Sequence, residues 1–202
     1  MKNIYLVGGG GHCLSCIDVI QLTKKFSIKG IIDDNKTDFE IKDFQVIGTD
    51  SILKSIIADD AFFLITIGQI KTPETRIKIF DKLKELDANL ASIISPSSYL
   101  SAYSFIDEGT IMMHGSIVNA GSQIGKNCII NTNALIEHNS VIGNHCHIST
   151  GAIINGGCRI GEGTFIGSQS VIKEGINIGT NCIVGAGCTV LNDLPDKTIY
   201  KN

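Results

Sequence analysis

A repeat of six residues fills the second half of this 202-residue chain. Starting at Ile106, every sixth residue through Val190 is aliphatic or methionine, and none of these fifteen positions is polar. The residue four positions later is small up to Cys188, with Ile176 as the exception. Glycine or asparagine usually precedes the small residue. A regular pattern of this length indicates one structural unit repeated along the chain.

The spacing favours short strands separated by turns. In each repeat one aliphatic and one small side chain would point inward, and glycine or asparagine would occupy a turn at positive φ. Six residues exceed the two-residue alternation of a strand and do not follow one face of an α-helix. The repeat therefore predicts a parallel β-helix, in which stacked coils bury the aliphatic column.

Composition narrows the class of protein further. The sequence shows no leader with charged, apolar and small segments, and no apolar run near the ~20 residues that span a bilayer. Its net charge of -3 argues against nucleic acid or an acidic membrane as a partner. We therefore expect a soluble, cytoplasmic protein that binds no nucleic acid and does not insert into a membrane.

Seven cysteines raise the question of a metal site or of disulfides. Five of them occupy the small column of the repeat, where a thiol serves as a small apolar side chain. Cys13 and Cys16 form a single C-x-x-C in a predicted helix, without a second pair or a thioredoxin-like context. We expect packing roles for all seven and no metal ion. The five in the column are Cys128, Cys146, Cys158, Cys182 and Cys188.

The first part of the chain alternates short buried strands with helices. This order, with a glycine loop between the first strand and the first helix, is typical of a small Rossmann-like α/β unit with a parallel sheet. Pro96 marks the start of the repeat region. We therefore expect a Rossmann-like domain over residues 1–95 and a β-helix domain over residues 96–202. The predicted strands cover residues 4–7, 28–32 and 62–67. One predicted helix follows the glycine loop and ends near Lys25, and a second runs from Pro73 to about Leu86.

The loop after the first strand consists of four glycines, Gly8 to Gly11. Backbone N–H groups at a strand-to-helix turn point toward a bound anion, and the absence of Cβ atoms lets a pyrophosphate approach. The dinucleotide fingerprint G-x-G-x-x-G is incomplete, because Cys13 stands where the third glycine belongs. Asp33 and Asp34 follow the second strand, where an acidic side chain can meet a ribose or base. The loop predicts a nucleotide ligand and leaves its base undetermined.

Together these features resemble the bacterial acetyltransferases that act on nucleotide-linked 4-amino sugars, and the related sialic acid O-acetyltransferases. The resemblance rests on Gly10-Gly11-His12, on Asp33-Asp34 and on hexads that begin with Ile-Gly, and it covers nearly the whole chain. It implies a left-handed β-helix with three walls per coil, and a homotrimer that binds acetyl-CoA between subunits. The nucleotide-linked amino sugar would be held by Gly8, Gly10, Gly11, His12, Asp33, Asp34 and Gly68.

The resemblance also assigns a catalytic base, the histidine of a Glu-His-x-x-x-Ile-Gly run, which is His138 here. An imidazole with a pKa near ~6.5 suits proton abstraction from an attacking amine, and a thioester is already activated, so no metal or covalent intermediate is required. Relatives often carry a carboxylate directly after this histidine, whereas this chain has Asn139. Either Glu137 substitutes for that carboxylate, or His138 is a weaker base.

Acetyl-CoA would meet a second group of residues. The resemblance places His147, of the run His147-Ile148-Ser149-Thr150-Gly151, at the acetyl group. A backbone N–H at a glycine-rich corner such as Gly156-Gly157 would serve as an oxyanion donor. His138 and His147 are nine residues apart, half of an eighteen-residue coil, so we expect them on nearly opposite sides of one prism and the active site shared between subunits. The cofactor-binding residues would be His147, Gly156, Ser168 and Gly185.

Other functions fit parts of the pattern. A γ-type carbonic anhydrase is also a left-handed β-helix and binds zinc through three histidines, but beside His145 and His147 no third histidine has the expected spacing. A non-catalytic nucleotide-binding protein is a second alternative. A nucleotide-dependent oxidoreductase is a third, disfavoured by the missing glycine. The favoured function is N-acetylation of a nucleotide-linked amino-dideoxy sugar, with O-acetylation of sialic acid or a related sugar as the main alternative.

Overall fold

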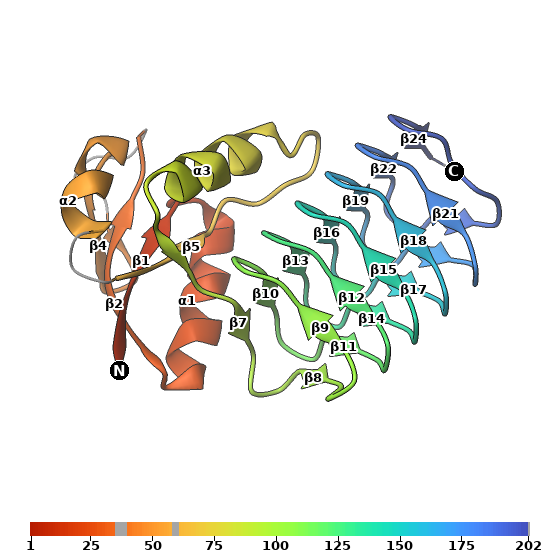
Figure 1. Cartoon of the computed structure of the whole chain (residues 1–202), viewed down its shortest axis with the longest axis horizontal. Coiled ribbons are helices and arrows are strands. Elements are labelled where there is room, and N and C mark those ends of the chain that lie inside the picture. Colours follow the sequence, from red (N-terminus) through yellow and green to blue (C-terminus); the bar gives the residue numbers. More distant parts are fainter. Residues whose placement is uncertain (35–39, 58–60, 202) are drawn as a thin grey trace.

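A computed structural model describes residues 1–34, 40–57 and 61–201 of the chain. A layered α/β part comes first and is followed by a long prism of stacked coils, with the C-terminus at the far end of the prism (Figure 1). Within the described residues, no helix has the length and apolar character needed to cross a bilayer. The same residues contain no group of three or more His, Cys, Asp or Glu side chains that could hold a metal ion.

The α/β part is built on a six-stranded sheet with the order β3-β4-β2-β1-β5-β6. Its neighbouring strands are parallel, except in the β3–β4 hairpin. Strand β1 is covered on both faces because its side chains alternate: Ile4 and Leu6 pack with α1, and Val7 packs with Phe80 of α3. The elements are β1 (Lys2–Val7), α1 (Gly11–Thr23), β2 (Phe26–Ile32), β3 (Glu40–Ile41), β4 (Phe44–Gly48), a 3-10 turn (Asp50–Ile52), α2 (Leu53–Ile57), β5 (Phe62–Ile65), α3 (Glu74–Glu85) and β6 (Asn89–Leu90).

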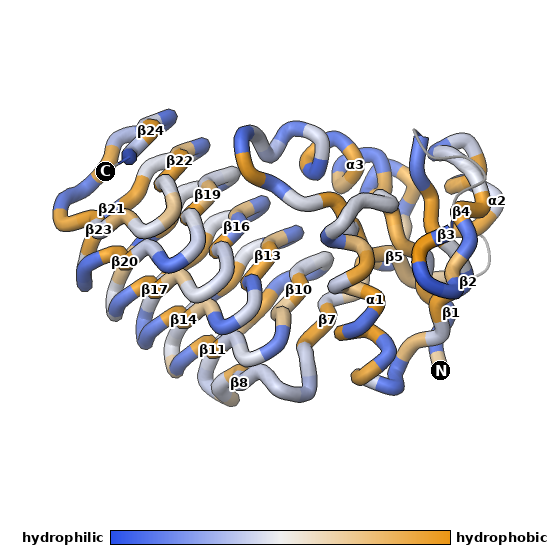
Figure 2. Tube along the Cα trace, turned by 180° about the vertical axis from the view of Figure 1, so that it is seen from behind, coloured by the Kyte–Doolittle hydropathy of each residue, from blue (hydrophilic) through white to orange (hydrophobic). Residues whose placement is uncertain are grey.

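The prism has three walls of two-residue parallel strands, which confirms the predicted β-helix. Paired residues are eighteen apart, as in Ile111↔Ile129, so three hexads complete one coil. Figure 2 shows the strands of the second wall stacked in one row from β8 to β23. Wall 1 contains β7 (Ile93–Ile94), β10 (Ile111–Met112), β13 (Ile129–Ile130), β16 (His147–Ile148), β19 (Phe165–Ile166), β22 (Ile183–Val184) and β24 (Ile199–Tyr200). Wall 2 contains β8 (Tyr99–Leu100), β11 (Ile117–Val118), β14 (Leu135–Ile136), β17 (Ile153–Ile154), β20 (Val171–Ile172) and β23 (Thr189–Val190). Wall 3 contains β9 (Phe105–Ile106), β12 (Gln123–Ile124), β15 (Val141–Ile142), β18 (Arg159–Ile160) and β21 (Asn177–Ile178).

The small inward column has a polar role as well as a packing role. Thr110 Oγ1 donates to the carbonyl of Gly125 (2.8 Å) and accepts from the backbone N–H of Cys128 in the next coil (2.9 Å). The Cys128 thiol donates in the same way to the carbonyl of Gly143 (3.1 Å). All seven cysteines are buried, as their predicted packing role requires, but the column thiols also satisfy buried backbone carbonyls. This explains why Ser, Thr and Cys, which carry a donor, are common there.

Glycine and asparagine occupy the coil turns at positive φ, as the repeat predicts. Asn139, for example, has φ 58° and Gly121 has φ 76°. Asparagine is among the few residues with a side chain that tolerate this region well. The predicted turn residues that adopt positive φ are Gly109, Gly115, Gly121, Asn127, Asn133, Asn139, Gly151 and Gly157.

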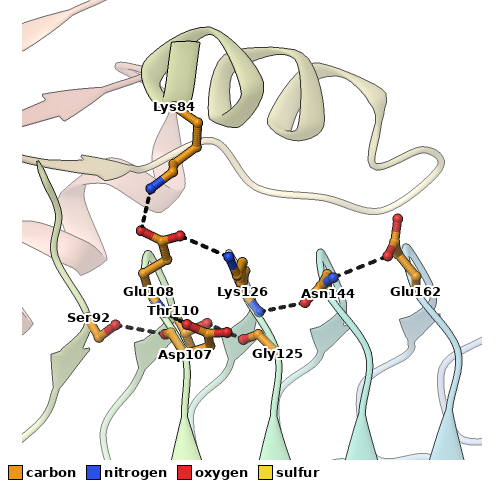
Figure 3. Close-up of polar contacts among 9 residues, drawn as sticks. All are labelled: Lys84, Ser92, Asp107, Glu108, Thr110, Gly125, Lys126, Asn144 and Glu162. Atoms are coloured by element: carbon orange, nitrogen blue, oxygen red, sulfur yellow. Dashed lines mark hydrogen bonds and ion pairs between the residues drawn. The ribbon is translucent and has the colours of Figure 1, made fainter. Parts of the chain in front are cut away.

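The two parts pack directly against each other. The chain leaves the α/β sheet after β6 and enters wall 1 at β7. The outward side chains of wall 1 at Ile111 and Ile129 share one buried cluster with Cys16 and Ile17 of α1. At the rim of this junction Glu108 accepts from Lys84 of α3 (2.9 Å) and from Lys126 (3.1 Å), as Figure 3 shows. The junction therefore fixes the glycine loop relative to the coils.

Candidate active site

His138 lies in the turn between wall 2 and wall 3 that follows β14, and its side chain is exposed. The turns at this edge, which include residues 137–140 and 155–158, are called the 2–3 corner below. Gly156, one coil further along, lies against the ring: a Cβ atom there would stand 2.7 Å from the Cε1 atom of His138. Glycine at this position therefore makes room for the imidazole.

The carboxylate of Glu137 does not contact the His138 ring. Its Oε2 atom accepts from Asn119 Nδ2 (3.0 Å) and from the backbone N–H of His138 (3.4 Å). The neighbour of the ring is Asn139, whose Nδ2 lies 3.3 Å from His138 Nδ1. An asparagine amide can donate to Nδ1 or, turned over, accept from an Nδ1–H, and only the second arrangement leaves Nε2 free to take a proton. Within one subunit, Asn139 occupies the position that an orienting carboxylate would hold.

The backbone supplies one free donor beside His138. The Gly157 N–H donates to the carbonyl of His138 (2.9 Å), so it is already used. In the described part of the chain no hydrogen bond is recorded for the N–H of Gly156. Of the two glycines, Gly156 is therefore the better candidate for stabilising an oxyanion next to the imidazole.

His147 lies in a different environment. It starts β16 on wall 1, and the loop between β5 and α3 covers it, leaving 6% of the residue exposed. Nδ1 donates to the carbonyl of Gln69 (2.6 Å), and Nε2 accepts from Asn131 Nδ2 (3.1 Å), so one neutral tautomer is fixed. Burial lowers the pKa of His147 to about 4, and nearby Arg76 adds to this effect against the Gln69 hydrogen bond. His147 and His138 lie on different parts of the prism and do not contact each other.

The other residues predicted to bind acetyl-CoA lie across wall 2 from His138. Ser168 and Gly185 belong to the turns between wall 1 and wall 2, called the 1–2 corner, which also include residues 131–134 and 149–152. Ser168 Oγ is 2.9 Å from Ser149 Oγ, and the N–H of Gly185 donates to the carbonyl of Tyr200 (2.8 Å). One subunit therefore presents these residues on one edge of wall 2 and His138 on the opposite edge.

The glycine loop connects β1 to α1. Gly8 has φ 108°, and a Cβ atom there would lie 2.2 Å from Ile67 Cγ1, so the residue must be glycine. Gly10 caps α1 without a side-chain hydrogen bond, and space is open where Cβ atoms of Gly10 and Gly11 would lie. This leaves the first turn of α1 accessible to an anion.

The acidic pair stands at the same edge of the sheet. Asp33 Oδ2 accepts from the N–H of Gly9 (2.6 Å), and Asp34 Oδ1 accepts from the N–H of Asp50 (2.9 Å). Both carboxylates border a cavity of about 110 Å³, which Gly8 also lines. The structure thus brings the loop and the acidic pair together at the carboxyl ends of the strands, where open α/β sheets bind ligands.

Comparisons with known proteins agree with this geometry. The family described as PglD N-terminal domain matches residues 3–83, and bacterial transferase hexapeptide repeats match residues 121–156 and 157–192. A mutant of perosamine N-acetyltransferase from Caulobacter crescentus, solved with CoA and GDP-perosamine, is 30% identical with a TM-score of 0.91, over 97% of this chain and 91% of that one. This chain belongs to the hexapeptide-repeat sugar N-acetyltransferases.

Two further relatives place it within this family. The acetyltransferase domain of PglB from Neisseria gonorrhoeae, solved with acetyl coenzyme A, is 26% identical with a TM-score of 0.89, over 96% of this chain and 93% of that one. UDP-N-acetylbacillosamine N-acetyltransferase from Bacillus subtilis (strain 168) is 31% identical over 115 residues, which are 56% of this chain and 52% of that protein. The matched stretch thus spans about half the length of that curated relative.

Arg76 is a residue of this acetyltransferase that sequence reasoning missed. It is 1% exposed, although it lies on α3 among charged residues that suggest a solvated helix face. Its guanidinium donates to the carbonyls of Ile65 and Ile67 and to both the carbonyl and Oδ1 of Asn127. Burial lowers the pKa of Arg76 to about 10. Arg76 thereby links the α/β sheet to the prism, and no pattern in the sequence marks it.

His12 lies close to this buried cation. Burial lowers the pKa of His12 to about 3, and the charge of Arg76, together with that of His147 when it is protonated, acts in the same direction. Its Nε2 atom is buried and has no hydrogen-bond partner in the described part of the chain. Gly68 packs near its Cβ atom (3.7 Å from a Cβ built on the glycine). His12 and Gly68 therefore lie together beside the glycine loop.

Proposed function

We propose that this enzyme transfers an acetyl group from acetyl-CoA to the 4-amino group of a nucleotide-linked amino-dideoxy sugar, with His138 as general base. The observation that carries the proposal is the exposed imidazole of His138 between Asn139 and the free N–H of Gly156. The relatives solved with CoA, acetyl-CoA or GDP-perosamine support the two ligands. We place the reaction in the cytoplasm, where acetyl-CoA is made.

Each ligand has its own part of the chain. The nucleotide would bind at the glycine loop, with its pyrophosphate on the open first turn of α1 and its ribose or base near Asp33 and Asp34. Acetyl-CoA would lie along the prism, with its thioester beside His138 and Gly156. The cavity shared by Gly8, Asp33 and Asp34, and the close approach of Gly156 to His138, support this division.

The transfer needs one base and one oxyanion donor. The neutral amine attacks the thioester carbonyl, and the carbonyl oxygen becomes an oxyanion that accepts a hydrogen bond from Gly156. With the Asn139 amide turned so that its Oδ1 accepts from Nδ1–H, His138 Nε2 removes a proton from the nitrogen, the C–S bond breaks, and CoA leaves as the thiol after receiving that proton. The products are the acetamido sugar and CoA, and no metal or covalent enzyme intermediate enters the scheme.

We further propose that the enzyme is a homotrimer with an active site between subunits. The outward residues of wall 2 from β8 to β20 form an apolar column that no other element of the described chain covers: Tyr99 is 56% exposed and Ile117 37%. Wall 2 separates His138 at the 2–3 corner from Ser168 and Gly185 at the 1–2 corner. Packing wall 2 around a three-fold axis buries the column and brings these two corners of neighbouring subunits together. The column comprises Tyr99, Ile117, Leu135, Ile153 and Val171.

Mass spectrometry tests the reaction. The enzyme is incubated with acetyl-CoA and UDP-, dTDP- or GDP-linked 4-amino sugars, and at least one of them should gain an acetyl group. His138→Ala serves as the control that separates enzymatic from spontaneous acetylation. If no amino sugar is acetylated while sialic acid or a related sugar is, O-acetylation is the correct function.

Subunit mixing tests the shared site. His138→Ala and Ser168→Trp proteins, the second with a bulky side chain on the opposite corner, are dissociated mildly and reassembled together. Hybrid trimers should recover part of the activity, because some interfaces then combine two intact edges. Light scattering that shows a monomer, or hybrids that stay inactive while wild type recovers, would refute the shared site.

A further inference from the structure

A second cavity lies between α1 and the 1–2 corner, away from the residues used so far. It has a volume of about 490 Å³ and is lined by Leu14, Ser15 and Asp18 of α1 and by Met113, His114 and Thr132 of the prism. Its walls combine hydroxyl, carboxylate and imidazole groups with apolar side chains. This mixture suits a sugar ring, which offers hydroxyl groups at its rim and C–H groups on its faces.

A hydrogen-bonded chain crosses this cavity and joins the two parts of the protein. His114 Nε2 lies 2.8 Å from Asp18 Oδ2, and His114 Nδ1 lies 2.8 Å from Ser95 Oγ. Ser95 is buried, so the chain is anchored at that end. The Asp18 side chain is 59% exposed, and no partner of its Oδ1 atom is recorded in the described part of the chain. The carboxylate is therefore held by one oxygen and can accept a hydrogen bond with the other.

The cationic groups around Asp18 do not neutralise it completely. Lys42 also lines the cavity, but its Nζ donates to Gln21 Oε1 (3.1 Å). His114 contacts the carboxylate from the prism. A neutral imidazole suffices for this contact, since Nε2–H can donate to Asp18 while Nδ1 accepts from the Ser95 hydroxyl. Asp18 then presents a negative charge to the cavity.

The cavity is within reach of a sugar attached to a nucleotide in the glycine loop. An α-helix rises ~1.5 Å per residue, so Ser15 and Asp18 lie roughly 6 and 10 Å along α1 from Gly11. A pyrophosphate bound at the first turn of α1 would leave its sugar about this far along the helix.

The cavity also lies at the level of the catalytic histidine. Thr132 lies in the turn before β14 and His138 in the turn after it, so both belong to one coil at opposite edges of wall 2. A closed ring formed by rotation alone moves no subunit along the axis. In a trimer around an axis parallel to the prism, the His138 edge of one subunit therefore meets the Thr132 edge of its neighbour at the same height.

We propose that Asp18, held by His114, binds the amino group of the acceptor sugar as an ammonium ion and thereby selects amino sugars over their hydroxyl analogues. The assignment rests on the proposed function. Aliphatic amines have ordinary pKa values of roughly 8–10, so the acceptor arrives largely protonated at neutral pH. A carboxylate binds such a cation through a charge-assisted hydrogen bond, whereas a hydroxyl gains much less from the charge. Asp18 is a recognition residue, and the transfer itself proceeds at His138 after the ammonium has lost one proton to solvent.

Calorimetric titration of Asp18→Asn tests the proposal without relying on turnover. A nucleotide-linked 4-amino sugar and its 4-hydroxy analogue are titrated into wild type and into the variant. The amino ligand should bind roughly 10–100-fold more weakly to Asp18→Asn, and the hydroxy ligand should change less than about 3-fold. Asp43→Asn, which removes the same charge at a nearby exposed position, should bind both ligands like wild type. The difference for the amino ligand should shrink above the pKa of its amine.

The possible outcomes separate the two proposals. An equal loss for both ligands would mean that Asp18 only supports the junction, and unchanged binding of the amino ligand would also overturn the assignment. Both results leave the proposed function intact if wild type still acetylates the amino sugar. A wild-type protein that binds neither ligand would overturn the proposed function and the Asp18 assignment with it. Thermal unfolding of each variant, with a melting temperature close to that of wild type, confirms that the comparison concerns folded protein.

Discussion

Acid should weaken the junction between the α/β part and the prism well before it protonates most carboxylates. Burial lowers the pKa of His12 to about 3 and that of His147 to about 4, and Arg76 contributes to both shifts. In the unfolded chain both imidazoles return to the ordinary value near 6.5. The unfolded chain therefore binds more protons than the folded protein throughout the range between these values.

The sign and size of the change in unfolding free energy with pH follow from proton linkage. A group with a depressed folded pKa stabilises the fold fully above its unfolded pKa, and this contribution is lost as pH falls toward the folded pKa. Each buried histidine should therefore lower the unfolding free energy by about 2 kcal/mol as the pH falls from ~7.5 to ~5, at 1.36 kcal/mol per pKa unit. Two such groups give about 4 kcal/mol, a large part of a typical unfolding free energy of 5–15 kcal/mol.

Urea unfolding followed by circular dichroism, at one protein concentration and several pH values, measures the effect. His147→Gln keeps an amide donor for the Gln69 carbonyl but cannot titrate. Its unfolding free energy should therefore fall by about 2 kcal/mol less than that of wild type over this pH range. His138→Gln removes an exposed imidazole instead and should follow the wild-type curve. Equal pH slopes for wild type and His147→Gln would refute the reasoning.

Three further predictions concern single residues. His138→Ala should lower kcat by roughly 10²–10⁴-fold with little change in the KM for acetyl-CoA, measured by CoA release, because only proton transfer is removed. Asn139→Asp, which tolerates positive φ, should keep or raise kcat in the same assay if an orienting charge benefits His138. Arg76→Met should cost about 3–5 kcal/mol of unfolding free energy in urea titrations, because it leaves the carbonyls of Ile65 and Ile67 and the Asn127 side chain without their donor.

The prism could be predicted almost completely from the sequence, because its signal repeats. Each coil places the same residue types at the same positions. The aliphatic column that ends at Val190 and the turn residues such as Asn139 therefore repeat in step, and each pattern supports the assignment of the other. The α/β part was predicted less fully: the β3–β4 hairpin and α2 were missed. These elements are short, and local pattern carries little information about which strand they pair with.

The candidate site could be predicted as a set of residues but not as an arrangement. Sequence spacing places His138 and His147 half a coil apart, but it does not show that the loop at Gln69 buries His147. The contacts of Arg76 with Asn127 and of Asp18 with His114 join residues 51 and 96 positions apart. Such pairs depend on how the two parts dock, and no local periodicity encodes that.

The structure explains why this chain can have Asn139 where relatives often carry a carboxylate. Asn139 occupies a coil turn with φ 58°, and its side-chain amide packs on Gly121 one coil earlier, where a Cβ atom would lie 2.3 Å from the amide. Asn133 stacks on Gly115 in the same manner, so the β-helix alone accounts for an asparagine here. The turn requires a residue that tolerates positive φ, and aspartate meets this requirement as asparagine does. The coil therefore fixes the backbone beside His138 but leaves the charge open, so the strength of the base can change at residue 139 without any change in the fold.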